Sequence, residues 1–114
     1  MRPVRAVDRA LSIITCLGEA DRRLVELSRS SKLHKATVTR LLASLLQAEM
    51  VSRNDNGVYT LGPAIAVLAS RLTNGHRTLI DVLREPMRRM WRLTQETICV
   101  HMLVGLSRTC IEEI

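Results

Sequence analysis

The run from Leu33 to Glu49, LHKATVTRLLASLLQAE, constrains the fold of this chain more than any other stretch. Its apolar residues recur at the spacing of one helix face, namely Val38, Leu41, Leu42, Leu45 and Leu46. That spacing predicts an amphipathic helix with one buried side. No acidic residue occurs between Glu26 and Glu49, whereas Arg29, Lys32, Lys35 and Arg40 are all cationic. Because an acid-free helix face can lie along a polyanion, we predict the recognition helix of a DNA-binding domain.

Two further helices are expected before this run. Apolar residues at helical spacing predict the first helix from Val7 to Glu19, namely Val7, Ala10, Leu11, Ile14 and Leu17. A shorter helix is expected from Arg23 to Ser31, followed by a turn at Lys32 and Leu33 and then by the helix from about Lys35 to Ala48. Two short helices joined by a tight turn, with the second one basic, are typical of a helix-turn-helix.

Two strands are expected after the recognition helix, from Met50 to Arg53 and from Val58 to Leu61. Val51, Tyr59 and Leu61 are available for their inner face. Between the strands, Asn56-Gly57 is a strong hairpin signal because both residues tolerate positive φ. Such a hairpin is the wing of a winged helix-turn-helix, which would bring its tip to the duplex backbone or minor groove. A hairpin that merely covers the core is compatible with the same pattern.

Gly62-Pro63 ends the wing and starts an apolar helix that is expected to close at Asn74-Gly75. This helix is too apolar for a solitary surface helix, so we expect it to pack on another helix, such as one from a second subunit. A further helix is expected from about Thr78 to Gln95, kinked or interrupted at Pro86. Its cations are Arg84, Arg88, Arg89 and Arg92, and a solvated face is favoured for them over a second DNA contact.

The last stretch, ICVHMLVGLSRTCIEEI, predicts a hairpin that turns at Gly105-Leu106. A two-residue turn there places Val104 opposite Ser107, His101 opposite Cys110, and Cys99 opposite Glu112. This register does not favour a Cys99–Cys110 disulfide. Since a single hairpin is only marginally stable in water, we expect it to be the start of a larger sheet.

Composition narrows the class of protein. The chain has 114 residues, with 17 Lys and Arg against 11 Asp and Glu, a net charge of +6 and a pI near 10.2. That imbalance favours nucleic acid or an anionic surface as a partner, although a basic surface without a partner is equally compatible with charge alone. Three cysteines make no even disulfide framework and indicate a reducing cytoplasm. No residue spacing indicates a zinc site, and no apolar run is long enough to span a membrane.

Three segments together resemble the N-terminal domain of the IclR-type bacterial transcriptional regulators: VDRALSIITCL, LVELSRSSKLHKATVTRLLASLLQAEMV and GVYTLG. The resemblance covers residues 6–62. Beyond it, LIDVLREPMRRMWRLTQETICVHMLVG is similar to the entry into the effector-binding domain of that family. The resemblance implies a dimeric winged-helix repressor or activator that binds a promoter palindrome.

The resemblance also implies a division of the chain and a fold class. A winged helix-turn-helix would occupy residues 1–62, a linker and dimerisation helix 63–76, and an incomplete start of the effector domain 77–114. The expected fold is therefore mainly α with a small β wing, followed by linker helices and a partial α/β effector domain. Since such a domain cannot be completed in 114 residues, we expect either a fragment or a truncated regulator.

Three positions depart from the family pattern. Lys32 occupies the turn position that is usually Gly, His34 replaces the usual Pro, and residues 21–24 are one or two positions short. A non-Gly residue at position 32 puts positive φ on a side chain that disfavours it. Lys32 also adds a cation near the expected phosphates.

The expected DNA contacts derive from the winged helix-turn-helix arrangement. Residues 35–40 would enter the major groove, because the first turns of a recognition helix reach base edges. Thr37 and Thr39 would contact a thymine methyl or a base edge, and Arg40 a guanine or a phosphate. The other cations and Ser31 would hold phosphates, and the wing would do the same. The full expected set is Arg29, Ser31, Lys32, Lys35, Thr37, Thr39, Arg40, Arg53 and Asn56.

The expected partners are double-stranded DNA and a second copy of the chain, as a homodimer or a dimer of dimers. A small-molecule effector is expected only if a full C-terminal domain exists, and no cofactor, metal, catalytic residue or membrane is expected. Two alternatives remain open. One is the N-terminal dimerisation domain of a small-molecule methyltransferase, although the chain has no Gly-rich cofactor loop. The other is a winged helix that dimerises without binding DNA.

Overall fold

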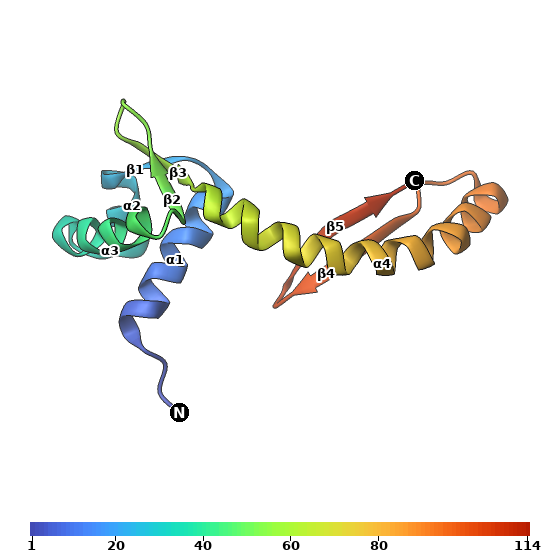
Figure 1. Cartoon of the computed structure of the whole chain (residues 1–114), viewed down its shortest axis with the longest axis horizontal. Coiled ribbons are helices and arrows are strands. Elements are labelled where there is room, and N and C mark those ends of the chain that lie inside the picture. Colours follow the sequence, from blue (N-terminus) through green and yellow to red (C-terminus); the bar gives the residue numbers. More distant parts are fainter. The chain divides into compact units, whose positions relative to one another are not determined.

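The chain divides into two compact units in a computed structural model that describes residues 1–72 and 74–114 in full (Figure 1). We refer to Met1–Ala69 as the N-terminal unit and to Ser70–Ile114 as the C-terminal unit. The elements in chain order are α1 (Arg5–Glu19), β1 (Arg22–Arg23), α2 (Leu24–Ser31), α3 (Lys35–Gln47), β2 (Val51–Arg53), β3 (Val58–Leu61), α4 (Pro63–Thr94), β4 (Cys99–Val104) and β5 (Ser107–Glu113). Three helices followed by a small winged sheet confirm the predicted fold class.

One hydrophobic core holds the N-terminal unit together. Its buried residues come from α1, α2, α3 and the wing, namely Ile13, Leu17, Leu27, Val38, Leu42, Leu45, Val51 and Tyr59. The α3 face predicted from the apolar spacing is therefore the buried one, with Leu41 and Leu46 half-buried at its margins. Burying a side chain of this size stabilises the fold by roughly 1.5–3 kcal/mol, so the core fixes α3 with its other face outward.

The turn between α2 and α3 depends on two residues. Lys32 caps α2 in the left-handed region with φ 57°, which confirms the positive φ expected when a lysine replaces glycine there. The Ser28 hydroxyl donates a hydrogen bond of 2.5 Å to the carbonyl oxygen of Leu33. The side chain of Leu33 packs against the core. These contacts set the direction in which α3 leaves the turn.

The wing is a three-stranded antiparallel sheet in the order β1-β3-β2. The strand β1 was not predicted; it pairs Arg22 with Tyr59 and is only two residues long. At the tip, the amide of Asn54 donates to the carbonyl of Val58, and only Gly57 has positive φ, at 77°. The loop is thus a three-residue turn that ends in a left-handed glycine, and the predicted hairpin between β2 and β3 is confirmed.

The end of the wing and the helix after it differ from the predictions in two ways. Leu61 lies two residues after Tyr59 and so shares its face of β3, but it is 37% exposed. The helix α4 then runs without a break through Asn74, Gly75 and Pro86, whereas two helices were expected. Glycine in a helix interior costs only about 1 kcal/mol relative to alanine, and the surrounding helix-forming residues offset that cost.

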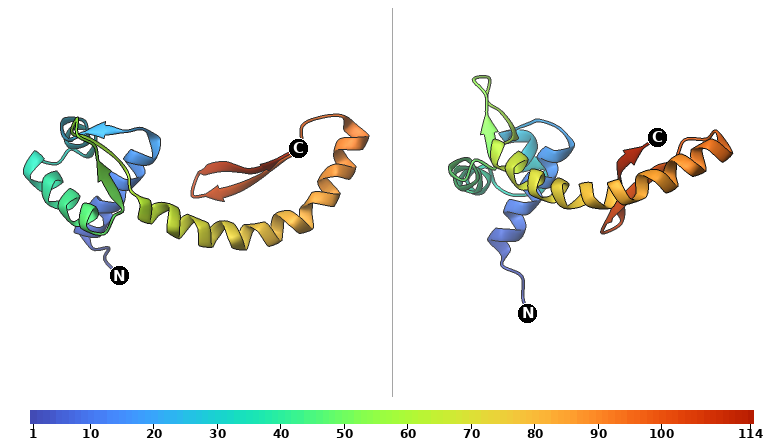
Figure 2. Two further views of the ribbon diagram at one scale, coloured as in Figure 1. Left: turned by 45° about the horizontal axis from the view of Figure 1, so that its top comes forward. Right: turned by 45° about the vertical axis from the view of Figure 1, so that its right-hand side comes forward.

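The strands β4 and β5 form a two-stranded antiparallel sheet in the C-terminal unit, joined to α4 by residues 95–98 (Figure 2). Val104 pairs with Ser107 and His101 with Cys110, as predicted. A bulge between Val100 and His101 shifts the remaining pairs by one residue. Cys99 consequently faces Glu113, so the prediction that it faces Glu112 was wrong.

Hydrophobic and charged contacts hold the C-terminal unit together. Ile80 and Met87 of α4 are buried, and the guanidinium of Arg84 lies 3.9 Å from a carboxylate oxygen of Glu112 on β5. The three cysteines of the chain are free thiols. Over the described residues, no helix combines the length and apolar character that crossing a membrane requires.

Candidate nucleic-acid interface

The first turns of α3 present the side chains predicted to read DNA. His34 is the N-cap in extended conformation, with φ −62° and ψ 147°, and the first turn carries no acid. Lys35, Thr39 and Arg40 are exposed, whereas Thr37 is half-buried. The Thr39 hydroxyl donates a 2.7 Å hydrogen bond to the carbonyl oxygen of Lys35. The hydroxyl proton of Thr39 is therefore used within the helix, and the exposed side chain keeps a methyl group and an acceptor oxygen, a combination suited to a thymine methyl.

The end of α2 and the turn after it carry the predicted phosphate contacts. Arg29 and Lys32 are exposed. Ser31 is half-buried, and its hydroxyl donates a 2.7 Å hydrogen bond to the carbonyl oxygen of Leu27. Its proton is thus used within its own helix, so of the three predicted phosphate contacts at this end of α2 the two cations are better placed to donate to a phosphate.

The wing tip is held by side-chain hydrogen bonds. The amide oxygen of Asn54 accepts bonds from the backbone N–H groups of Asn56 at 2.9 Å and Val58 at 3.0 Å. A guanidinium nitrogen of Arg23 donates to the backbone carbonyl of Asn56 at 2.7 Å. The Arg53 guanidinium lies 5.6 Å from the centroid of the Tyr59 ring, within cation–π range. The exposed side chains of Arg53 and Asn56 therefore stand on an ordered loop.

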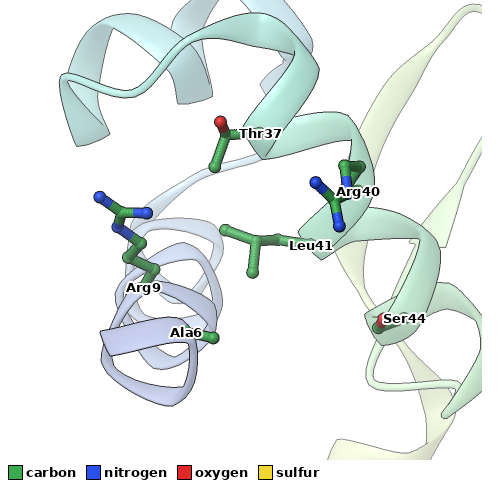
Figure 3. Close-up of a pocket in the computed structure, with 6 residues that line it drawn as sticks. All are labelled: Ala6, Arg9, Thr37, Arg40, Leu41 and Ser44. Atoms are coloured by element: carbon green, nitrogen blue, oxygen red, sulfur yellow. The ribbon is translucent and has the colours of Figure 1, made fainter. Parts of the chain in front are cut away.

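A groove of about 320 Å³ between α1 and α3 adds a residue that the sequence-based prediction missed. It is lined by Ala6, Arg9, Thr37, Arg40, Leu41 and Ser44. Figure 3 shows the guanidinium groups of Arg9 and Arg40 on either side of Leu41. Arg9 lies four residues before Ile13 and eight before Leu17, both of which are buried, so it is a cation on the apolar face of α1. That position was the signal that could have revealed it.

The cations of α2, α3 and the turn between them are not neutralised by carboxylates among the described residues. The N-terminal unit contains one ion pair among its described residues, at 3.8 Å between Arg22 and Glu19. In the part of the chain that the structure describes, Arg29, Lys35 and Arg40 form no ion pair with a carboxylate. Unneutralised cations on a folded surface create a positive potential that attracts a polyanion and steers it to this surface.

Comparison with known proteins agrees with this geometry. The model of the IclR helix-turn-helix domain matches residues 6–55, which run from α1 into the wing loop. These residues are therefore similar to the IclR helix-turn-helix domain. The family resemblance expected from the sequence is therefore confirmed. No curated protein sequence matches the chain.

Solved structures extend the likeness beyond the IclR domain. A protein assigned as an ICLR transcriptional regulator of Silicibacter sp. is 28% identical, with a TM-score of 0.76 over 96% of this chain and 44% of that one. An IclR family transcriptional regulator of Brucella abortus is 20% identical, with a TM-score of 0.83 over 98% and 43%. An IclR homolog of Microbacterium hydrocarbonoxydans, complexed with 4-hydroxybenzoate, is 19% identical, with a TM-score of 0.64 over 92% and 46%. This chain thus spans less than half the length of the structures that it resembles.

Proposed function

We propose that this chain is a transcriptional regulator that binds double-stranded DNA through its IclR domain. The observation that carries the proposal is the exposed, unpaired positive charge on the first turns of α3, at Lys35 and Arg40. A helix held by its apolar side and cationic at its start can enter the major groove with its N-terminal residues. The match of residues 6–55 to the IclR helix-turn-helix domain supports this assignment.

The contacts divide into those that read bases and those that position the protein. Thr37, Thr39 and Arg40 would reach base edges from the first turns of α3, since an arginine can donate two hydrogen bonds to a guanine. Lys35, with Arg29 and Lys32 before it, would bind phosphates and set the register. Arg53 would do so from the wing. Only the first group is expected to change the preferred sequence when mutated.

The second copy of the chain is proposed from the start of α4. Leu68 and Leu72 lie one helical step apart, and each is 57% exposed. Leu68 also lines a mostly apolar groove of about 410 Å³, together with Ala48, Glu49, Met50, Pro63, Ala64 and Val67. Burying exposed apolar surface of this kind favours association of two copies. Two recognition helices roughly 34 Å apart would then read a palindrome.

Sedimentation of the purified chain tests the second copy. The wild-type chain is expected to sediment as a dimer or a dimer of dimers, and Leu68→Glu as a smaller species, because a buried carboxylate opposes association. Leu106→Glu is the matched control, since Leu106 lies fully exposed in the β4–β5 turn. If the wild-type chain and Leu68→Glu sediment alike, the start of α4 is not the dimer surface.

Two further properties are proposed with this function. The regulator would bind a small-molecule effector if a complete C-terminal domain comes after the hairpin. The Microbacterium hydrocarbonoxydans homolog was solved in complex with 4-hydroxybenzoate. The three free thiols are in keeping with the reducing cytoplasm, where such a regulator would work.

A DNA titration tests the proposed function directly. Fluorescence anisotropy with labelled duplex from upstream of the protein's own reading frame should show tighter binding than a shuffled duplex of equal length. Affinity should fall steeply with salt, because each neutralised phosphate releases counterions. Equal affinity for both duplexes would indicate DNA binding without sequence recognition. No affinity while the chain still dimerises would indicate a winged-helix interaction module instead.

A further inference from the structure

The hairpin of the C-terminal unit gathers three side chains that commonly bind metals. Cys99 and His101 lie on β4 and Cys110 lies on β5, and all three are exposed. Their potential ligand atoms, two sulfurs and one imidazole nitrogen, all lie within 4.8 Å of one another. Cys99 and His101 share a face because they are two residues apart in a strand, and His101 pairs directly with Cys110.

The bulge between Val100 and His101 adds a fourth donor to this face. Cys110 and Glu113 are three residues apart, so a regular strand would place them on opposite faces. The extra residue in the bulge brings Glu113 opposite Cys99 instead. A carboxylate oxygen of Glu113 lies 3.8 Å from the Cys99 sulfur. The sequence spacing concealed this arrangement because it depends on the bulge.

We propose that the β4–β5 hairpin binds a zinc ion through Cys99, His101, Cys110 and Glu113. Two thiolates, an imidazole and a carboxylate form a ligand set that suits zinc and disfavours magnesium or calcium, which take oxygen ligands. In a tetrahedral site with Zn–S bonds of about 2.3 Å, two sulfur ligands lie about 3.8 Å apart. The three donors that lie within 4.8 Å of one another, on Cys99, His101 and Cys110, therefore need to move by only about 1 Å to enclose the ion, and Glu113 would close the site from beside Cys99.

The site would join the two strands of a sheet that has only β4 and β5. Two ligands come from each strand, so the ion would act as a cross-link close to the open ends of the hairpin. A two-stranded hairpin is marginally stable by itself, and metal binding adds its free energy to the folded state. This site is separate from the IclR domain and does not depend on DNA binding.

A competing use of the same thiols is a disulfide between Cys99 and Cys110. The strand register pairs Cys110 with His101, so the two cysteines are diagonal neighbours across the hairpin, and both are free thiols. Diagonal neighbours lie roughly 7–8 Å apart at Cα, beyond the usual span of a disulfide. The geometry therefore favours a shared ion over a covalent bond.

Cobalt titration of the reduced, metal-free chain tests the proposal. One Co²⁺ per chain should bind, with the thiolate charge-transfer and tetrahedral d–d absorption of a Cys-ligated ion, and Zn²⁺ should displace it. Cys99→Ser and Cys110→Ser should each weaken binding by about tenfold or more. Two variants serve as matched controls. Cys16→Ala removes the thiol of the N-terminal unit, and His76→Ala is the control for the ligand change His101→Ala. Both controls should bind as the wild-type chain does.

A second measurement on the wild-type chain avoids any folding defect of a variant. Alkylation mapped by mass spectrometry should show that Zn²⁺ protects Cys99 and Cys110 but leaves the rate at Cys16 unchanged. Absence of a thiolate–cobalt band in the reduced chain would overturn the proposal, as would equal alkylation of Cys99 with and without Zn²⁺. A disulfide found in the oxidised chain, with no metal binding after reduction, would also overturn it.

Discussion

The guanidinium of Arg23 donates a 2.7 Å hydrogen bond to the backbone carbonyl of Asn56, which links the residue before α2 to the tip of the wing across 33 positions of sequence. Arg23→Ala removes this link but keeps the backbone bond from residue 23 to Glu26. We expect amide hydrogen exchange at residues 54–58 to become about fivefold faster. Arg108→Ala removes an equal charge from the C-terminal unit and should leave that exchange unchanged. If both variants exchange alike, the link does not order the wing.

Lys32 is expected to lower the stability of the turn that it forms. A side chain in the left-handed region costs roughly 1–2 kcal/mol, which glycine avoids. Glycine also increases the conformational entropy of the unfolded chain, and this offsets part of the stabilisation. Lys32→Gly should therefore raise the free energy of unfolding by about 0.5–1 kcal/mol in urea titrations. It should also weaken DNA binding by removing a phosphate contact. A less stable Lys32→Gly chain would contradict the assigned backbone conformation.

Gly62 lies where the wing meets α4, and a side chain does not fit there. A Cβ at this position would lie against the carbonyl oxygen of Glu49 and 2.7 Å from the backbone nitrogen of Val51. Gly62→Ala should destabilise the fold by about 2 kcal/mol or more, because backbone must move. Gly75→Ala is the control, since nothing lies within 4 Å of its Cβ and alanine favours a helix. Thermal unfolding should show a lower Tm for Gly62→Ala but not for Gly75→Ala.

Arg9 is expected to add a phosphate contact from α1, beside Arg40 in the groove. Arg9→Ala should weaken binding to specific and shuffled duplexes by a similar factor, because a phosphate contact carries no sequence information. Anisotropy titrations of both duplexes measure this. A loss confined to the specific duplex would assign Arg9 to base reading instead.

On α1 the predicted apolar stripe was partly wrong, because Val7 and Leu11 are 53% and 55% exposed whereas Ile13 is buried. On α3 the apolar residues recur at helical spacing, so its buried face could be predicted from sequence. The burial of Val38 and Leu42 results from that spacing. The positive φ of Lys32 was expected from the family position that it occupies. Local pattern is sufficient in these cases because each helix buries one continuous face against one core.

Features set by interactions far apart in sequence could not be predicted in the same way. The helix α4 continues through Gly75 and Pro86 even though both residues disfavour a helix interior. The strand β1 exists only because it pairs with β3, and the Cys99–Glu113 contact exists only because of the bulge in the second hairpin. Likewise, Arg9 joins the groove only when α1 packs against α3.

The salt dependence of DNA binding by Arg40→Ala tests the central claim most directly. The account predicts weaker affinity for the specific duplex and a slope of log K against log salt that is smaller in magnitude by about 1 when Arg40 holds a phosphate. If Arg40 reads a guanine, discrimination against the shuffled duplex should fall instead, by about 1–3 kcal/mol. Arg108→Ala, which removes the same charge from β5, should match the wild-type chain in both quantities. Wild-type affinity, slope and discrimination in Arg40→Ala would contradict the claim that α3 enters the DNA.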